Sequence, residues 1–299
     1  MRDLTDTAAD AIRGIGLVAL GYLIITLGDV AAKWTLPAVG VAGAMIWRGV
    51  FGAGTVVALA GRRATLRPVR VGLVLLRSFL HTLVSLAWYV AWLSMSLVDT
   101  YAVGFVAPLL MTLLAIPILG ERIRWRRILS TTVGFAGVLI MLRPEGDLWT
   151  PAVLPLLAGV VLLAISRITM RVLARTETPE CISFFLLLMH LPVGVLALCW
   201  FPSTLPSGTV VWVALVGLGA CNGVAHWLFS RAYALAPVGA LAPYEYTTML
   251  WGGALGFLVF AEVPSWNTIA GAVVVAAAGL YNLHRERMRR REERAAQTS

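Results

Sequence analysis

The stretch LWTPAVLPLLAGVVLLAIS, residues 148–166, carries no charged side chain. An α-helix of about 20 apolar residues is long enough to cross the ~30 Å hydrocarbon core of a bilayer. A helix is expected for such a run, because backbone groups that face lipid must form their hydrogen bonds within their own segment. The strands of a membrane barrel would alternate apolar and polar residues, and this stretch does not alternate. It therefore predicts a transmembrane helix.

Comparable apolar runs occupy most of the chain on both sides of this stretch. Of the 299 residues, 59% are hydrophobic and 13% are charged, whereas a soluble domain carries about 25% charged residues. We therefore predict an all-α polytopic membrane protein with ten transmembrane helices. The predicted spans are residues 14–33, 38–60, 71–93, 98–119, 128–142, 151–170, 180–200, 209–231, 239–261 and 267–284.

The basic residues are distributed unevenly between the loops. If the N-terminus is cytoplasmic, the cytoplasmic segments hold 20 of the 24 Lys and Arg residues. These segments are the N-terminal tail, the loops at 61–70 and 120–127, the region 167–178, the end of the eighth span and the C-terminal tail. Such a bias matches the positive-inside rule. It predicts an inner-membrane protein with both termini in the cytoplasm, and it explains the net charge of +9 without a nucleic-acid partner.

Motifs of soluble enzymes are missing from the chain. Lys33 is the single lysine, so no G-x-x-x-x-G-K-[ST] loop exists, and H-E-x-x-H and G-x-S-x-G are also absent. Cys181, Cys199 and Cys221 lie inside predicted spans without a C-x-x-C pair, which favours buried apolar roles over a disulfide or a metal site. The sequence predicts no enzyme, no catalytic residue, no cofactor and no metal.

A shift of 141 residues aligns the two halves of the chain. It pairs Glu121 with Glu262 and Trp125 with Trp266, at the same distance after an apolar span. This favours an internal duplication. The predicted organisation is a cytoplasmic N-tail at 1–13, a first five-helix repeat at 14–142, a second at 143–284 and a basic cytoplasmic C-tail at 285–299.

Five spans per repeat is an odd number, so the second repeat would enter the membrane with the opposite polarity. Inverted repeats recur in secondary transporters, where they provide alternating access. The small-residue pairs Gly219/Gly223 and Gly252/Gly256 are typical of closely packed membrane helices.

Ionisable residues inside predicted spans are candidate functional groups, because a charge at the bilayer centre is costly. Asp29 and Lys33 stand four residues apart and are expected to form an ion pair, with a structural clamp and a gating or coupling role both open. Arg48 is a candidate partner for an anionic group, the alternative being that it extends to the membrane interface.

The third and eighth spans carry matching polar and aromatic stripes. Arg77, His81, Ser85, Trp88 and Trp92 share one helical face, and the shift places Asn222, His226, Phe229 and Tyr233 opposite the last four. We expect a shared central cavity, with helix–helix hydrogen bonding as the alternative. Arg77 is a further candidate for gating or coupling.

The ninth span begins with Tyr244, Glu245 and Tyr246, followed one turn later by Trp251. An intramembrane glutamate is a functional candidate by default; it could bind an ammonium group, accept a proton or pair with an arginine. The aromatic side chains would favour flat or cationic substrates. We predict that these residues, together with Trp88 and Tyr101, line the cavity.

Several stretches resemble the EamA-type repeat of the drug/metabolite transporter superfamily. They are Leu76-Arg77-Ser78, Asp99-Thr100, Ala107-Pro108-Leu109, Leu119-Gly120-Glu121-Arg122 and Gly134–Val138 in the first half, and Ala242–Tyr246, Phe260-Ala261-Glu262 and Gly279-Leu280-Tyr281 in the second. Ala261 departs from the family pattern, which has glycine before the glutamate. The resemblance implies ten helices in two inverted repeats. Among members, amino-acid exporters of the YddG type are the nearest functional analogy.

These observations predict a secondary carrier that exports amino acids, including aromatic ones, by alternating access. His81, Ser85, Asn222, His226 and Glu245 would provide polar anchoring, and Asp29 or Glu245 could couple transport to protons. The open alternatives are a carrier of nucleotide-like metabolites or cationic drugs and a membrane sensor without transport. The expected partners are a small molecule and the lipid bilayer, with the protein a monomer or a homodimer.

Overall fold

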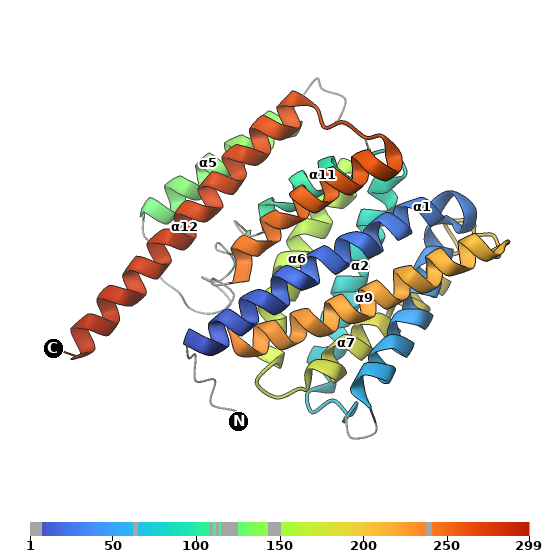
Figure 1. The fold of residues 1–299 in the computed structure, drawn as a ribbon, viewed down its shortest axis with the longest axis horizontal. Coiled ribbons are helices and arrows are strands. Elements are labelled where there is room, and N and C mark those ends of the chain that lie inside the picture. The colour runs from blue at the N-terminus through green and yellow to red at the C-terminus, as the bar shows by residue number, and fades with distance from the viewer. Residues whose placement is uncertain are drawn as a thin grey trace.

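The computed structural model describes residues 8–61, 65–107, 110–111, 114, 125–142, 151–236 and 241–298. The described segments are helical with short connections (Figure 1). The elements are α1 (Ala8–Ala60), α2 (Val71–Trp92), α3 (Leu97–Gly104), α5 (Trp125–Leu142), α6 (Val153–Leu173), α7 (Pro179–Leu188), α8 (His190–Ala197), α9 (Thr209–Leu235), the 3-10 helix η1 (Ala242–Tyr246), α11 (Thr247–Phe260) and α12 (Trp266–Thr298).

Within the described residues, 5 helical segments are long and apolar enough to cross a membrane, which makes this a multi-pass membrane protein. They are Ile12–Ala60, Val71–Trp92, Val153–Leu173, Pro179–Ala197 and Thr209–Leu235. The helices α3, α5 and α11 and the apolar first part of α12, Trp266–Ala278, overlap the remaining predicted spans. Ten crossings in two inverted repeats stay a prediction.

The first two predicted spans correspond to two helices that meet at a kink inside α1. We predicted a break at residues 34–37, but α1 runs through this region with Pro37 inside it. The change of direction occurs at Gly40, which has φ 70 and ψ 172, outside the helical region. Glycine adopts this conformation without the steric cost of a side chain. Its ideal Cβ would also lie 2.5 Å from the Pro202 carbonyl oxygen, so close packing requires glycine here as well.

The predicted span at 180–200 is interrupted in its middle. α7 ends at Leu188 and α8 begins at His190, with Met189 between them. Pro192 explains the interruption, because it has no N–H to donate to the Leu188 carbonyl and its ring crowds that carbonyl. The helix bends here without leaving the apolar segment.

Glycines bring α1 and α9 into direct backbone contact along their length, and the two helices lie side by side in Figure 1. An ideal Cβ on Gly219 would lie 2.8 Å from the Gly52 nitrogen, and one on Gly223 would lie 2.9 Å from the Gly52 carbonyl oxygen. The predicted close approach at Gly219 and Gly223 is therefore present. Such contacts hold membrane helices together where lipid removes the hydrophobic driving force.

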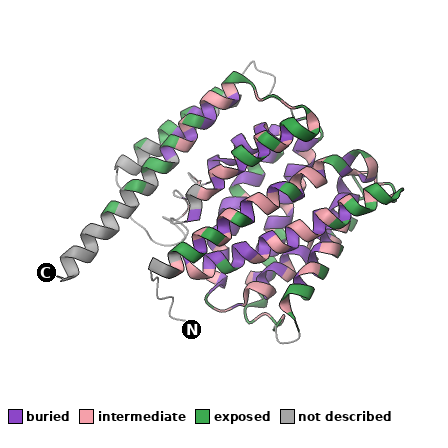
Figure 2. Ribbon diagram, viewed as in Figure 1, coloured by how far each residue is buried: buried purple, intermediate pink, exposed green. Residues whose placement is uncertain are grey.

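The buried residues concentrate where α1, α2, α6 and α9 pack (Figure 2). α5 and α12 pack on each other at the periphery of the molecule (Figure 1). α12 continues as helix to Thr298, so the predicted end of the last span at residue 284 is not the end of the helix. Residues 120–124 of the predicted loop at 120–127, among them Glu121, and residues 143–150 lie outside the described residues.

Candidate functional site

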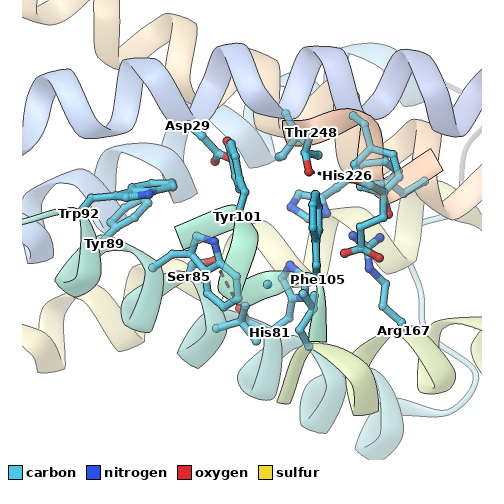
Figure 3. Close-up of a pocket in the computed structure, with 18 of the residues that line it drawn as sticks. Asp29, His81, Ser85, Tyr89, Trp92, Tyr101, Phe105, Arg167, His226 and Thr248 are labelled. Atoms are coloured by element: carbon cyan, nitrogen blue, oxygen red, sulfur yellow. Dashed lines mark hydrogen bonds between the residues drawn. The ribbon is translucent and has the colours of Figure 1, made fainter. Parts of the chain in front are cut away.

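A cavity of about 100 Å³ lies at the centre of the helices. Side chains from α1, α2, α3, α6, α9, η1 and α11 line it (Figure 3). Its aromatic walls are Tyr22, Trp88, Tyr89, Trp92, Tyr101, Phe105 and Phe229; its charged groups are Asp29, Arg48, Arg167 and Glu245; and its other polar groups are His81, Ser85, His226 and Thr248. A concave cavity that combines apolar and aromatic walls with convergent polar groups is typical of small-molecule binding.

One end of the cavity is organised around Asp29 of α1. Tyr101 of α3 donates a hydrogen bond from its Oη to Asp29 Oδ2 at 2.7 Å. The tyrosine ring reaches this position because Gly252 of α11 has no side chain, and an ideal Cβ there would lie 2.4 Å from Tyr101 Cε2. The absence of a side chain at Gly252 thus allows Tyr101 to reach the Asp29 carboxylate.

Arg48 of α1 extends into the same region rather than to the membrane interface. It is 4% exposed. Its Nη1 donates to Tyr89 Oη at 3.3 Å and its Nη2 lies 3.2 Å from His226 Nε2. Since a guanidinium has only donors, His226 Nε2 accepts this bond. The buried cation is held in place by partners on α2 and α9.

The middle of the cavity contains two histidines from the two predicted repeats. The His81 and His226 rings meet edge to face with centroids 5.0 Å apart. His81 Nδ1 lies 3.1 Å from Ser166 Oγ, and Ser85 Oγ lies 3.1 Å from His190 Nε2. The predicted stripe on the third span is therefore part of a buried polar network that connects α2 with α6, α8 and α9.

Arg167 of α6 occupies the other end of the cavity, away from Tyr89 and Trp92 (Figure 3). It is 6% exposed. The guanidinium carbon lies 4.9 Å from the ring centroid of Phe229, 5.6 Å from that of Tyr22 and 5.8 Å from that of Tyr233. Such aromatic faces attract a cation, most strongly where water is excluded.

Glu245 lies at the same end as Arg167 and interacts with it electrostatically. It belongs to η1, directly before α11, and a carboxylate near the start of a helix is stabilised by the helix dipole. Its Oε2 is buried without a hydrogen-bond partner. The cavity therefore has one acidic and one basic group at each end.

Of the predicted site residues, eight line the cavity. They are Asp29, Arg48, His81, Ser85, Trp88, Tyr101, His226 and Glu245. Whether these residues bind a substrate or couple its transport stays a prediction. The other predicted residues lie elsewhere.

Lys33 does not pair with Asp29, which corrects the expected i, i+4 ion pair. It forms a salt bridge with Glu262 and donates to the Met95 carbonyl oxygen at 2.7 Å. Glu262 Oε2 also accepts from the Leu97 nitrogen at 2.9 Å. Local spacing predicted the wrong partner because the turn after α11 brings a carboxylate from far along the chain.

Arg77 and Asn222 lie between helices, outside the cavity lining. Arg77 Nη1 donates to the Ile182 carbonyl oxygen at 3.4 Å. Asn222 Nδ2 donates to the Leu218 carbonyl oxygen at 2.8 Å, and its amide packs on Gly28. Arg77 therefore fits the alternative of helix–helix hydrogen bonding, whereas the hydrogen bond of Asn222 lies within α9.

The aromatic residues predicted around Glu245 also do not line the cavity. Tyr246 packs edge to face on Phe105 with centroids 4.9 Å apart, and Tyr244 packs against the apolar cluster formed by α1, α6 and α9. Trp251 is 39% exposed on the outer side of α11. Only one side of this helix start faces inward, and Glu245 and Thr248 occupy it.

Sequence reasoning missed Arg167, as well as the lining residues Tyr22, Tyr89 and Phe105. Arg167 was counted among the cytoplasmic basic residues, but α6 continues to Leu173. The signal was present: Leu163 and Met170 are buried at i−4 and i+3, on the same helical face. Among the described residues, no cluster of three or more His, Cys, Asp and Glu side chains is arranged to hold a metal.

The fold and the cavity define a multi-pass helical membrane protein with a buried cavity lined by polar and aromatic side chains. Residues 150–282 match the EamA-like transporter family. This match covers most of the predicted second repeat, and the family is one of transporters, not of enzymes.

Two relatives illustrate the similarity over most of the chain. A riboflavin transporter of Brucella anthropi is 28% identical over 86% of this chain and 94% of the relative. An S-adenosylmethionine uptake transporter of Rickettsia bellii is 27% identical over 71% of this chain and 74% of the relative. A solved crystal structure with 19% identity superposes with a TM-score of 0.65, covering 88% of this chain and 95% of the other, which shows a shared fold.

Proposed function

We propose that this chain is an EamA-type secondary transporter that carries a small metabolite with a flat heteroaromatic ring through the central cavity. The observation that carries the proposal is the cavity itself. It combines seven aromatic side chains with an acid and a base at each end. Aromatic walls favour flat rings, and the few polar groups would fix their orientation.

The similar transporters support a heteroaromatic substrate. One carries riboflavin and another S-adenosylmethionine, and both of these compounds contain a flat nitrogen heterocycle. Their shared feature matches the aromatic walls of this cavity better than it matches a general amino-acid substrate. The proposal therefore favours the nucleotide-like alternative of the sequence analysis over amino-acid export.

The helix packing supports two inverted repeats. Contacts of the fifth span with the tenth and of the fourth with the ninth map onto themselves under a two-fold relation between the repeats, and α5 packs on α12 and α3 on α11. The same relation makes span 6 the counterpart of span 1, and span 3 the counterpart of span 8. If span 1 packs on span 8, span 6 should therefore pack on span 3. These are the contacts of α1 with α9 and of α6 with α2. Exchange of conformation between such halves would give alternating access.

Orientation and assembly belong to the same proposal. The concentration of arginines in the predicted cytoplasmic segments supports an inner-membrane protein with both termini in the cytoplasm. We expect a monomer or a homodimer. Cysteine-accessibility mapping of residues before α1 and after α12 tests the orientation, and labelling of the two ends from opposite sides of the membrane contradicts it.

A flux assay in liposomes tests the proposal. We expect the reconstituted protein to move labelled riboflavin or labelled S-adenosylmethionine faster than empty vesicles do. Trp88→Ala should reduce this flux about tenfold, since one stacking contact contributes ~1–3 kcal/mol. Trp212→Ala, at a side chain 37% exposed and outside the cavity, is the matched control. Absence of flux for both compounds contradicts the proposal, and binding without flux indicates a sensor.

A second candidate is an exporter of aromatic amino acids. Asp29 and Arg48 lie at the same end of the cavity, where they would hold the ammonium and the carboxylate of a zwitterion. Labelled phenylalanine and tyrosine in the same liposomes separate the candidates. Flux of these compounds, unaffected by an excess of riboflavin, favours amino-acid export.

A further inference from the structure

Four polar atoms at or beside the Arg167 end of the cavity are buried without a hydrogen-bond partner of good geometry. They are Tyr22 Oη, Arg167 Nε, Tyr233 Oη and Glu245 Oε2. They come from α1, α6, α9 and η1, and the Tyr22 and Tyr233 rings both lie within 6 Å of the Arg167 guanidinium. Tyr22 faces Glu245 and Tyr233 faces Arg167, without hydrogen bonds of good geometry between them. Native structures rarely leave such groups unpaired, so the cluster is suited to accept a further partner.

The opposite end of the cavity has its polar groups largely satisfied from within the protein. Asp29 accepts from Tyr101, and both Nη atoms of Arg48 have partners in Tyr89 and His226, which leaves Arg48 Nε alone unpaired. The two ends therefore differ in how many of their buried polar atoms have hydrogen-bond partners. The protein provides the partners at one end, and a bound molecule would provide them at the other.

The unpaired atoms limit the chemistry of that molecule. Arg167 Nε can only donate a hydrogen bond, and an ionised Glu245 can only accept one. An anion would be repelled by Glu245 and a cation by Arg167. A neutral group that offers an acceptor next to a donor satisfies both residues. The tyrosine hydroxyls can adopt either role.

We propose that Tyr22, Arg167 and Glu245, with Tyr233 packed on Arg167 outside the cavity lining, form a subsite for the donor–acceptor edge of a neutral heteroaromatic ring. An imide, with N–H beside C=O, and an amidine, with NH₂ beside a ring nitrogen, both have such an edge. The edge accepts from Arg167 and donates to Glu245, while the ring extends between the aromatic walls of the cavity. This subsite rests on the proposed function, and it identifies the part of the substrate that the protein recognises by hydrogen bonds.

Matched ligand pairs test the subsite in the full-length protein in detergent. The first pair is lumiflavin and its N3-methyl derivative, and the second is adenosine and its N6-dimethyl derivative. Methylation removes the donor from the edge and leaves the flat ring in place. In calorimetric titration, we expect the parent compound of at least one pair to bind about tenfold or more tightly than its methylated derivative, because a buried polar site rejects a ligand that leaves it unpaired.

The variant Glu245→Met removes the acceptor with little change in side-chain volume. We expect it to bind both members of the pair with equal affinity, and its unchanged affinity for the methylated compound shows that the cavity is intact. If this variant does not fold, Glu245→Gln should lower the discrimination at least threefold, because the charge is lost. Glu180→Gln, whose carboxylate bonds Trp227 outside the cavity, should keep the full discrimination.

The outcomes separate the two proposals. Equal binding of both members of each pair by the unmodified protein, or discrimination that survives in Glu245→Met, overturns the subsite and leaves transport of flat rings standing. Absence of binding by all four compounds, together with absence of flux in liposomes, overturns the proposed function and the subsite with it.

Discussion

Lys33 of α1 is joined by a salt bridge to Glu262, which follows α11. The two side chains are 12% and 16% exposed. Together they also hold the backbone before α3, since Lys33 donates to the Met95 carbonyl oxygen and Glu262 accepts from the Leu97 nitrogen. Three segments distant in sequence are thereby fixed at one end of the molecule.

We expect Lys33→Met to lower the free energy of unfolding by about 3 kcal/mol, because removal of one partner leaves a largely buried charge uncompensated. Thermal unfolding in detergent measures the effect. The double variant Lys33→Met with Glu262→Gln should recover part of the loss, since the unpaired carboxylate is then gone. A double variant that is less stable than Lys33→Met alone contradicts this account.

Gly252→Ala tests the packing that positions Tyr101. The new methyl group would overlap the Tyr101 ring, which would have to move and release Asp29. We expect a loss of about 1–3 kcal/mol in stability, typical of overpacking, and a loss of flux. Gly253→Ala is the matched control, because its nearest neighbour is Val98 Cγ2 at 3.9 Å. Equal effects of the two substitutions contradict the assignment.

Helical periodicity predicted much of the central cavity. His81 and His226 stand on the inward faces of two apolar segments, and the repeat shift related the stripes that contain them. The structure brings the two rings together. Such prediction succeeds because residues three or four positions apart share a helical face whatever the helix packs against.

The remaining features depend on contacts between distant segments. The partner of Lys33 is set by the turn after α11, 229 residues away, and no local spacing reveals it. The position of Arg167 in the cavity lining was not predicted, because the positive-inside rule assigns an arginine near a span end to the cytoplasm. Trp251 was misplaced because an aromatic residue at helical spacing is equally consistent with an outward face.

Substitution of Ala261 tests whether the backbone is strained at the turn that precedes Glu262. It has φ 55 and ψ 29, the left-handed conformation that costs a residue with a side chain about 1–2 kcal/mol. The chain therefore keeps the turn in spite of the missing glycine. We expect Ala261→Gly to raise the free energy of unfolding by about 1 kcal/mol. Ala254→Gly, at an exposed position inside α11, should lower it by a similar amount. A decrease for both variants contradicts the strain.

Arg48→Lys tests whether the two-sided attachment of the guanidinium matters for transport. Arg48 contacts Tyr89 with Nη1 and His226 with Nη2, whereas the single ammonium of lysine cannot span both partners with the same planar geometry. Loss of one charge-assisted hydrogen bond corresponds to about 1.5–3 kcal/mol. We therefore expect flux at low substrate concentration to fall about tenfold or more.

The matched control is Arg231→Lys, because Arg231 is exposed and its guanidinium lies 4.7 Å from the ring centroid of Trp227, away from the cavity. This substitution keeps the positive charge at that position, so insertion and topology should not change. Both variants should reach the membrane in equal amounts, and only Arg48→Lys should lose flux. If Arg48→Lys transports as well as the unmodified protein, its contacts with Tyr89 and His226 serve packing alone, and the charged groups that act on the substrate are those around Arg167.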